Sequence, residues 1–325
     1  MKIGISVNLD VKKNRGGIER YVSQLIQNLM MLNESKEHQF FLYNRKNLNW
    51  PFRWGWTQIR LSWEMFRNKP DVLFVPSHTF PLIHPKKIVV TIQGLEYERA
   101  PKYYSLWQRK KLRFLTKRNS KKATKIIVPS KCTKNDLVKL YKINPEKIFV
   151  VYHGIEKKRQ RNKETKYIKK IREPHILYLG SEHKRKNIEG LKKVCEILKE
   201  KYKIPHKLIL AGVKQYINEE KKEKLLSNAD VFVFLSFYEG FGFPVLEAQS
   251  RGVPVVSSNK SSLPEILGNS ALLVNPNNFE ETTKRIYDIL TNKSLRDNLI
   301  KKGYNNIKQF SWQNCAKETL KIICE

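Results

Sequence analysis

The sequence predicts an α/β protein made of two doubly wound domains. The chain has 325 residues, which exceeds one typical domain and suits two. Short apolar runs alternate with helical patterns along both halves, which is typical of parallel strands joined by crossover helices. A charge-dense stretch separates the halves, and an apolar content of 40% is sufficient for buried cores.

The first domain is predicted to span residues 1–155. It opens with a strand, Lys2–Asn8, and a polar loop that contains Gly16 and Gly17. Apolar residues at helical spacing predict a helix over Ile18–Leu32. Runs of β-branched or aromatic residues bounded by turn residues predict the later strands, which are Phe40–Tyr43, Val72–Val75, Ile88–Ile92, Lys125–Val128 and Ile148–Tyr152.

Residues 156–173 are predicted to form a linker, because nine Lys and Arg residues lie between Lys157 and Arg172 without clear periodicity. The second domain is expected over residues 174–310. A final helix is expected within 311–325. The strands predicted for the second domain are His175–Gly180, Lys207–Gly212, Val231–Ser236, Pro254–Ser258 and Ala271–Val274.

The charge is extreme, with 63 basic against 30 acidic residues and a formal net charge of +33. Two explanations stay open: a generally Lys-rich proteome, and attraction to an anionic membrane surface or lipid-linked acceptor. Nucleic acid is not expected as a partner, because the sequence has no zinc-finger spacing, aromatic RNA-binding motif or Gly-rich basic repeat.

The protein is expected to be cytoplasmic, with peripheral contact at the inner face of the cell membrane. No segment approaches the roughly 20 apolar residues of a membrane helix, and the first residues do not resemble a signal peptide. Its four cysteines lie far apart, and we interpret them as reduced thiols.

The segment after Val231–Ser236 is the most informative part of the chain. Glu239 follows the strand, Gly240 and Gly242 permit close approach to the backbone, and a helix is expected to begin near Pro244. Free N–H groups and the helix dipole would favour an anion at this point. The alternative is an ordinary loop-to-helix junction with solvated carboxylates.

Glu239–Glu247 matches the pattern Glu-Gly-Phe-Gly-x-Pro-x-x-Glu, and on this segment the chain resembles the retaining glycosyltransferases of family 4. The resemblance implies the GT-B fold, in which two Rossmann-like domains face a cleft and the final helix packs back on the N-terminal, acceptor-side domain. Further matching segments are Ala229–Phe234, Gly252–Ser258, Ser262–Glu265 and Phe310–Trp312. The tract Arg60–Glu98 is most similar to the mannosyl- and rhamnosyl-type members that build bacterial polysaccharides.

The resemblance implies a role for each matching residue. Glu239 would contact the donor sugar, and Glu247 would bind the ribose hydroxyls. Arg185 and Lys186 would neutralise the departing diphosphate, and the loop of Gly16 and Gly17 would close over it. The backbone around the second glycine loop would complete the donor site, at Gly240, Phe241, Gly242, Val245 and Leu246.

Two departures from the family pattern bear on activity. Gln93 stands where many members have a His close to the transferred sugar, and Gln can hydrogen-bond a hydroxyl but cannot take a proton. Retaining transfer in this family is thought to be a front-face process without a protein nucleophile, so Gln93 is compatible with it. Val213–Asn228 is too short for the helix and strand usual there, so the second domain is expected to lack about one βα unit and its nucleobase contacts cannot be assigned.

The expected function is the transfer of a hexose or deoxyhexose, with mannose as the best candidate, from a GDP- or UDP-linked sugar. The acceptor would be a glycan or a lipid-linked glycan in cell-envelope polysaccharide synthesis. The nucleotide sugar is a substrate, and neither a cofactor nor an essential metal is expected. The alternatives are a catalytically weak or silent donor-binding scaffold and a nucleotide-sugar epimerase of the same fold.

The stretch from Arg99 to Lys134 has thirteen basic residues and no acid. In a helix, Arg109, Arg113 and Lys117 would lie on one side. We expect this surface to rest on an anionic membrane, and the alternative is solvated charge on a crossover helix. We interpret His78, His84 and His153 as packing or structural residues.

Overall fold

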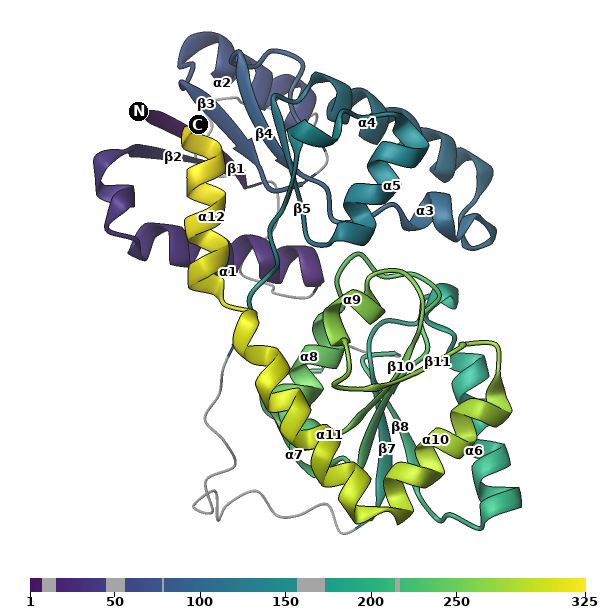
Figure 1. The fold of residues 1–325 in the computed structure, drawn as a ribbon. Helices are drawn as coiled ribbons and strands as arrows, with labels where there is room; N and C mark the ends of the chain where they lie inside the picture. Colours follow the sequence, from purple (N-terminus) through teal and green to yellow (C-terminus); the bar gives the residue numbers. More distant parts are fainter. Residues whose placement is uncertain (8–15, 45–55, 78, 157–172, 214–216) are drawn as a thin grey trace. The chain divides into compact units, whose positions relative to one another are not determined.

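The computed structural model describes residues 1–7, 16–44, 56–77, 79–156, 173–213 and 217–325. These residues divide into two compact units (Figure 1). Unit 1 comprises Met1–Gly154 together with Ser311–Glu325, and unit 2 comprises Ile155–Phe310. Most of the expected linker, residues 157–172, lies outside the described residues, as does His78.

Unit 1 has a six-stranded sheet in the order β2-β1-β3-β4-β5-β6, and every described pairing is parallel. β3 is a fully buried run of Val, Leu and Phe, and in β5 the residues after Lys125 are buried Ile and Val, as expected for a sheet covered on both faces. The strands are β1 (Lys2–Val7), β2 (Gln39–Asn44), β3 (Val72–Val75), β4 (Lys87–Thr91), β5 (Lys125–Val128) and β6 (Ile148–Val150).

Helices join and cover the strands of unit 1. The last helix of the chain packs against the first, because its apolar face, including Ala316 and Leu320, is buried in this unit. The helices are α1 (Gly17–Met31), α2 (Leu61–Arg67), α3 (Glu96–Arg99), α4 (Leu106–Lys122), α5 (Lys131–Tyr141) and α12 (Trp312–Cys324).

Unit 2 has a five-stranded parallel sheet in the order β11-β10-β9-β7-β8. The strands are β7 (His175–Leu179), β8 (Lys207–Ala211), β9 (Val231–Phe234), β10 (Val255–Ser258) and β11 (Leu272–Val274). Each predicted strand is therefore confirmed, with its ends shifted by at most two residues.

Between β8 and β9 the described residues contain one helix, α7, in agreement with the expected shortening of this domain. The helices of unit 2 are α6 (Ile188–Tyr202), α7 (Glu219–Asn228), α8 (Phe243–Ser250), α9 (Leu263–Leu267), α10 (Phe279–Thr291) and α11 (Lys293–Asn306). Short single turns lie at 184–186 and 307–309.

The strand order reverses once in each sheet, and this places the functional segments. In unit 2 the chain passes from β7 to β8 on one side and then to β9 on the other side of β7. In unit 1 it passes from β1 to β2 and then to β3 on the opposite side of β1. Open α/β sheets bind ligands beyond the carboxyl ends of the strands at such reversals.

In the part of the chain that the structure describes, no helix is long and apolar enough to cross a membrane.

Candidate active site

The basic pair and the first carboxylate of the predicted site meet at the strand reversal of unit 2. Arg185 and Lys186 lie in the turn Lys184–Lys186 after β7, and Glu239 lies in the loop after β9. β7 and β9 are neighbours in the sheet, so both loops leave the same edge. This strand pairing brings together Lys186 and Glu239, which are 53 residues apart, and a hydrogen bond from Phe237 N to Arg185 O also joins the two loops.

Three charged side chains form the centre of the site. Lys186 Nζ lies 2.6 Å from Glu239 Oε1, and Arg185 Nη1 lies 2.9 Å from the same oxygen. The side chains of Lys186 and Glu239 are only 9% and 10% exposed, and that of Arg185 is 17% exposed. Two cations therefore share one anion, which leaves the group with one excess positive charge next to the strand ends.

Burial and the two cations act on Glu239 in opposite directions. Burial by itself raises the pKa of the carboxyl, but the charges of Lys186 and Arg185, with hydrogen bonds, hold the pKa below its ordinary value. Glu239 is thus a carboxylate at neutral pH. Lys186 Nζ also lies 4.9 Å from the centre of the Phe234 ring, a favourable contact between a cation and an aromatic face.

Two serines that the sequence analysis did not assign hold the backbone of Glu239. Ser261 Oγ accepts a hydrogen bond from Glu239 N at 2.7 Å and donates to Glu239 O at 2.8 Å. Ser262 Oγ lies 2.9 Å from the same carbonyl oxygen. Ser261 has a φ of 54°, in the left-handed region. Ser262 opens the Ser262–Glu265 segment that matches the family pattern, whereas nothing in the local sequence distinguishes Ser261 from other loop serines.

The start of α8 follows the predicted pattern. Gly242 has a φ of 118°, and a Cβ there would lie 3.0 Å from Leu263 Cδ2, so both backbone conformation and packing favour glycine. The side chains of Phe241, Val245 and Leu246 are buried in unit 2, where Phe241 packs edge-on against Phe243. Only the backbone of these three residues is thus left for the ligand contact that the resemblance implies.

The second carboxylate of the motif has a partner that was not predicted. Glu247 Oε1, on α8, lies 3.0 Å from Lys222 Nζ on α7. Both side chains are largely buried, at 9% and 15% exposed. No sequence signal identifies Lys222, because it is one of several basic residues on α7 and the pair is 25 residues apart.

In unit 1, Gln93 follows β4 and contacts His153, which follows β6. His153 Nε2 lies 2.8 Å from Gln93 Oε1, and because an amide oxygen only accepts, the proton is on Nε2. His153 is fully buried, with its ring 4.3 Å from that of Tyr21 and 6.2 Å from that of Trp312. The interpretation of His153 as a structural residue is confirmed. In addition, His153 orients the side-chain amide of Gln93.

Burial lowers the pKa of His153 from 6.5 to about 3. As the pH falls below 6.5, the unfolded chain takes up a proton that the folded chain excludes, so stability decreases towards acid pH. The loss is about 1.4 kcal/mol for each pH unit, or about 2 kcal/mol at pH 5.

All six tryptophans belong to unit 1, so their fluorescence in urea reports its unfolding. His153→Gln is expected to remove this part of the acid sensitivity between pH 7 and 5, and equal sensitivity in both proteins would contradict the prediction.

The glycine loop of unit 1 begins α1. Gly16 is exposed and has a φ of −136°, which any residue can adopt. In the part of the chain that the structure describes, the atom nearest to a Cβ at this position would be Glu19 Oε2, at 3.9 Å. Gly17 is exposed as the first residue of the helix. The fold of the described residues therefore does not itself require a glycine at position 16.

Two arginines of the expected basic surface share an acidic partner that the sequence analysis did not identify. Arg113 Nη2 lies 2.5 Å from Glu98 Oε2, and Arg109 Nη2 lies 3.7 Å from the same oxygen. The Glu98 side chain is 3% exposed and also accepts a hydrogen bond from Tyr141. Two of the three arginine and lysine residues expected to face a membrane thus neutralise a buried carboxylate.

The packing interpretation of His84 is confirmed, since its Nδ1 contacts Pro85 O and its ring meets Phe80 edge-on.

Two family models match consecutive parts of the sequence. One is described as glycosyltransferase family 4 and matches residues 15–159. The other is described as glycosyl transferases group 1 and matches residues 158–306. The two matches together extend over both units.

Two curated relatives are mannosyltransferases. O-antigen chain mannosyltransferase B of Escherichia coli is 36% identical over 169 residues, which is 45% of this chain and 44% of the relative. O-antigen chain mannosyltransferase RfbU of Salmonella typhimurium is 28% identical over 282 residues, which is 78% of this chain and 75% of the relative. The match thus spans less than half of the first relative.

Among solved structures, the fold is similar to that of WaaG, a glycosyltransferase involved in lipopolysaccharide biosynthesis. The TM-score is 0.75 with 12% sequence identity, over 99% of each chain. At this identity the similarity shows that the fold is shared.

Proposed function

Because the chain belongs to glycosyltransferase family 4, as its family models and mannosyltransferase relatives show, we propose that it transfers a mannose-type hexose or deoxyhexose from a nucleotide-diphosphate sugar. The acceptor would be a glycan or lipid-linked glycan of a cell-envelope polysaccharide. The observation that supports this most is the buried group of Arg185, Lys186 and Glu239 at the strand reversal of unit 2. Its excess positive charge suits a diphosphate, and its carboxylate suits sugar hydroxyls.

We propose that this group acts by electrostatic stabilisation. Negative charge grows on the diphosphate as the bond to the sugar breaks, and Arg185 and Lys186 are already fixed by Glu239 before the ligand arrives. Preorganised charges of this kind need no rearrangement during the reaction. The backbone N–H groups at the start of α8 add positive potential for the same anion. The reaction would proceed with retention of configuration, without a protein nucleophile and without an essential metal.

Gln93 and Gly16 would support the transferred group from unit 1. Gln93 Nε2 is buried and has no hydrogen-bond partner among the described residues, and a buried donor left unsatisfied costs about 1–3 kcal/mol. Because His153 holds the other end of the amide, this nitrogen is the end of Gln93 left for a sugar oxygen. Gly16, which the described fold does not require, would allow close approach of the donor to the backbone.

The proposal is tested by thermal unfolding and calorimetry with UDP-, GDP- and dTDP-linked sugars. At least one class is expected to raise the melting temperature in proportion to the logarithm of its concentration. Binding followed by turnover with a glycan acceptor supports the transferase. Binding without turnover supports the donor-binding scaffold, and isomerisation without an acceptor supports the epimerase.

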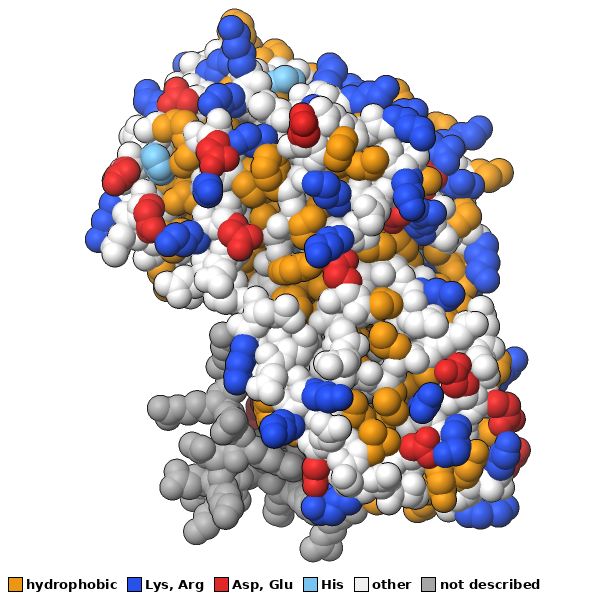
Figure 2. Space-filling view, viewed as in Figure 1, with side chains coloured by type: hydrophobic (Ala, Val, Ile, Leu, Met, Phe, Trp, Pro, Cys, Tyr) orange, Lys and Arg blue, Asp and Glu red, His pale blue; other side chains and the backbone are white. Residues whose placement is uncertain are grey.

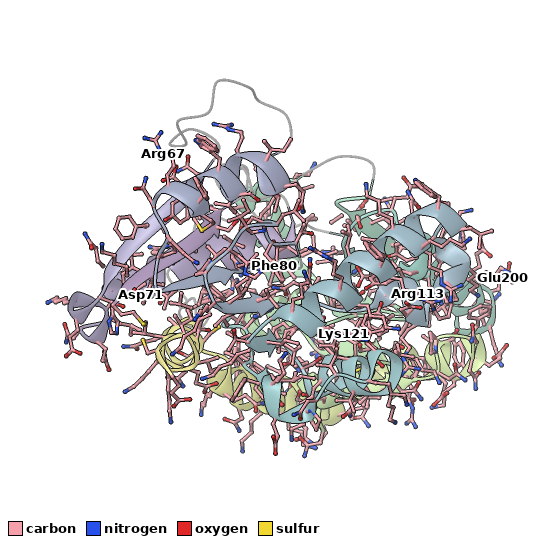
Figure 3. All side chains as sticks on the ribbon, turned by 90° about the horizontal axis from the view of Figure 1, so that it is seen from above. Arg67, Asp71, Phe80, Arg113, Lys121 and Glu200 are labelled. Carbon is pink, nitrogen blue, oxygen red and sulfur yellow. The ribbon has the colours of Figure 1, made fainter. Side chains whose placement is uncertain are left out.

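We also propose that α4 brings unit 1 to an anionic membrane that presents the acceptor. From Leu106 to Lys122 this helix has eight Lys and Arg residues and no acid. Leu106, Trp107 and Phe114 are 75%, 77% and 66% exposed. Figure 2 shows Lys and Arg side chains gathered over α4 with hydrophobic side chains among them, and Figure 3 shows Arg113 and Lys121 along this helix. Exposed aromatics beside cations are typical of interfacial helices.

Trp107→Ala is expected to weaken binding to vesicles that contain anionic lipid by about three- to ten-fold, because it removes the most exposed aromatic side chain of α4. Co-sedimentation at about 0.15 M salt measures this. Met31→Ala is the matched control, since Met31 at the end of α1 is 70% exposed but not on α4. Equal binding of the unchanged chain to neutral and anionic vesicles would refute the membrane contact.

A further inference from the structure

The nucleoside end of the proposed donor site has an unusual feature in α7. By the resemblance, the segment between β8 and β9 is where family members place a nucleobase loop, and the described part of it here consists largely of α7. This helix directs Lys222 at Glu247, the carboxylate proposed for the ribose hydroxyls. Lys222 is therefore the cation that the shortened segment supplies to this end of the site.

Other interactions besides the Lys222–Glu247 pair fix Lys222 and α7 in place. Lys222 Nζ lies 2.8 Å from Glu219 Oε2, one turn earlier on α7. Glu223, the next residue on α7, pairs with Arg251 at the end of α8, where Arg251 Nη2 lies 2.6 Å from Glu223 Oε2. Leu225 and Leu226, one turn after Lys222 on the same side of α7, are buried. The position of α7 on α8 thus does not depend on Lys222 alone.

The ion pair is compatible with ribose binding at Glu247. An ionised carboxylate has about four acceptor positions, so one hydrogen bond from Lys222 leaves capacity for sugar hydroxyls. A carboxylate that is 9% exposed is costly without a cation, and Lys222 supplies that cation and fixes the orientation of the carboxylate. An oxygen that hydrogen-bonds to Oε1 of Glu247 then lies within about 6 Å of the Lys222 ammonium, given two hydrogen-bond lengths of about 3 Å.

We propose that Lys222 is a positioning residue for nucleoside recognition, which holds Glu247 for the ribose hydroxyls of the donor. This inference rests on the proposed function, because it needs a nucleotide in unit 2. The Lys222–Glu247 pair would make the donor site bind a nucleoside diphosphate more tightly than a bare diphosphate. The diphosphate itself is left to Arg185 and Lys186.

The test compares three ligands by calorimetry: UDP, GDP and inorganic pyrophosphate, which lacks the nucleoside. Lys222→Met is expected to weaken binding of the preferred nucleotide by about ten-fold or more, the usual effect of losing a hydrogen bond to a charged group. Binding of pyrophosphate is expected to stay unchanged. Lys222→Arg, which retains the charge, should restore part of the loss. Lys221→Met is the matched control, because Lys221 is the exposed neighbour on the same helix.

The outcomes separate this inference from the proposed function. If the unchanged chain binds none of the three ligands, the donor site itself is wrong and the inference falls with it. If the unchanged chain binds a nucleotide and Lys222→Met binds it equally well, only the inference is wrong. Equal losses for nucleotide and pyrophosphate would also overturn it, since Lys222 would then act on the diphosphate or on folding.

Discussion

Lys186→Ala is expected to lower kcat/KM for sugar transfer by about a hundred- to a thousand-fold, the usual effect of removing one preorganised charge from a developing anion. The Lys186 side chain is 9% exposed, and its ammonium is fixed between Glu239 Oε1 at 2.6 Å and the Phe234 ring at 4.9 Å. Without it the excess positive charge of the group disappears, because Arg185 and Glu239 then neutralise each other. Steady-state kinetics with the preferred donor measure the change.

A loss of activity in Lys186→Ala can be attributed to the missing ammonium, because the Arg185–Glu239 pair remains in this variant. Glu239 keeps its contact with Arg185 and its backbone hydrogen bonds to Ser261, so the loop is expected to stay folded. Lys184→Ala is the control, since Lys184 is exposed in the same turn. Lys186→Arg should restore little, because the wider guanidinium does not fit the place of a compact ammonium. Activity of Lys186→Ala within about three-fold of the unchanged enzyme would remove Lys186 from the mechanism.

Gly154→Ala is expected to destabilise unit 1 by about 3 kcal/mol, at the upper end of the cost of overpacking. A Cβ at Gly154 would lie 2.1 Å from Trp312 N and 2.5 Å from Trp312 Cα. These are backbone atoms at the first turn of α12, so the start of the helix has to move to make room. The same movement would disturb the contact between the Trp312 and His153 rings.

Urea unfolding followed by tryptophan fluorescence measures this effect, because every tryptophan lies in unit 1. Gly16→Ala is the matched control for stability. Among the described residues, the atom nearest to its new Cβ would lie 3.9 Å away, and its backbone is extended, so a change within about 0.5 kcal/mol is expected. Similar unfolding midpoints for Gly154→Ala and the unchanged chain would show that α12 does not depend on close contact at Gly154.

The sequence was sufficient to predict the strands and the loop-to-helix junction before α8. The strands are buried apolar runs, as in Val231–Phe234, and a run of this kind is visible without tertiary information. The glycine loop before α8 was predictable because Gly242 has a positive φ that few residues adopt.

The unpredicted contacts are pairs of charged or polar side chains from different elements. Lys222 with Glu247, Gln93 with His153 and Arg113 with Glu98 are 25, 60 and 15 residues apart. Periodicity describes only neighbours on one helix or strand, so it gives no information about such pairs. For α4, helical spacing indicated which arginines share a face, but it could not show that Glu98 neutralises two of them.

The central claim is that unit 2 binds a nucleotide sugar and that the sugar is transferred with retention. The most direct measurement is proton NMR of the reaction with the preferred donor, a panel of mannose- and rhamnose-terminated glycans and a chelator. We expect release of the nucleoside diphosphate and a new glycosidic bond with the anomeric configuration of the donor, and we expect Lys186→Ala to abolish most of both. An inverted bond, or isomerisation of the donor without an acceptor, would contradict it.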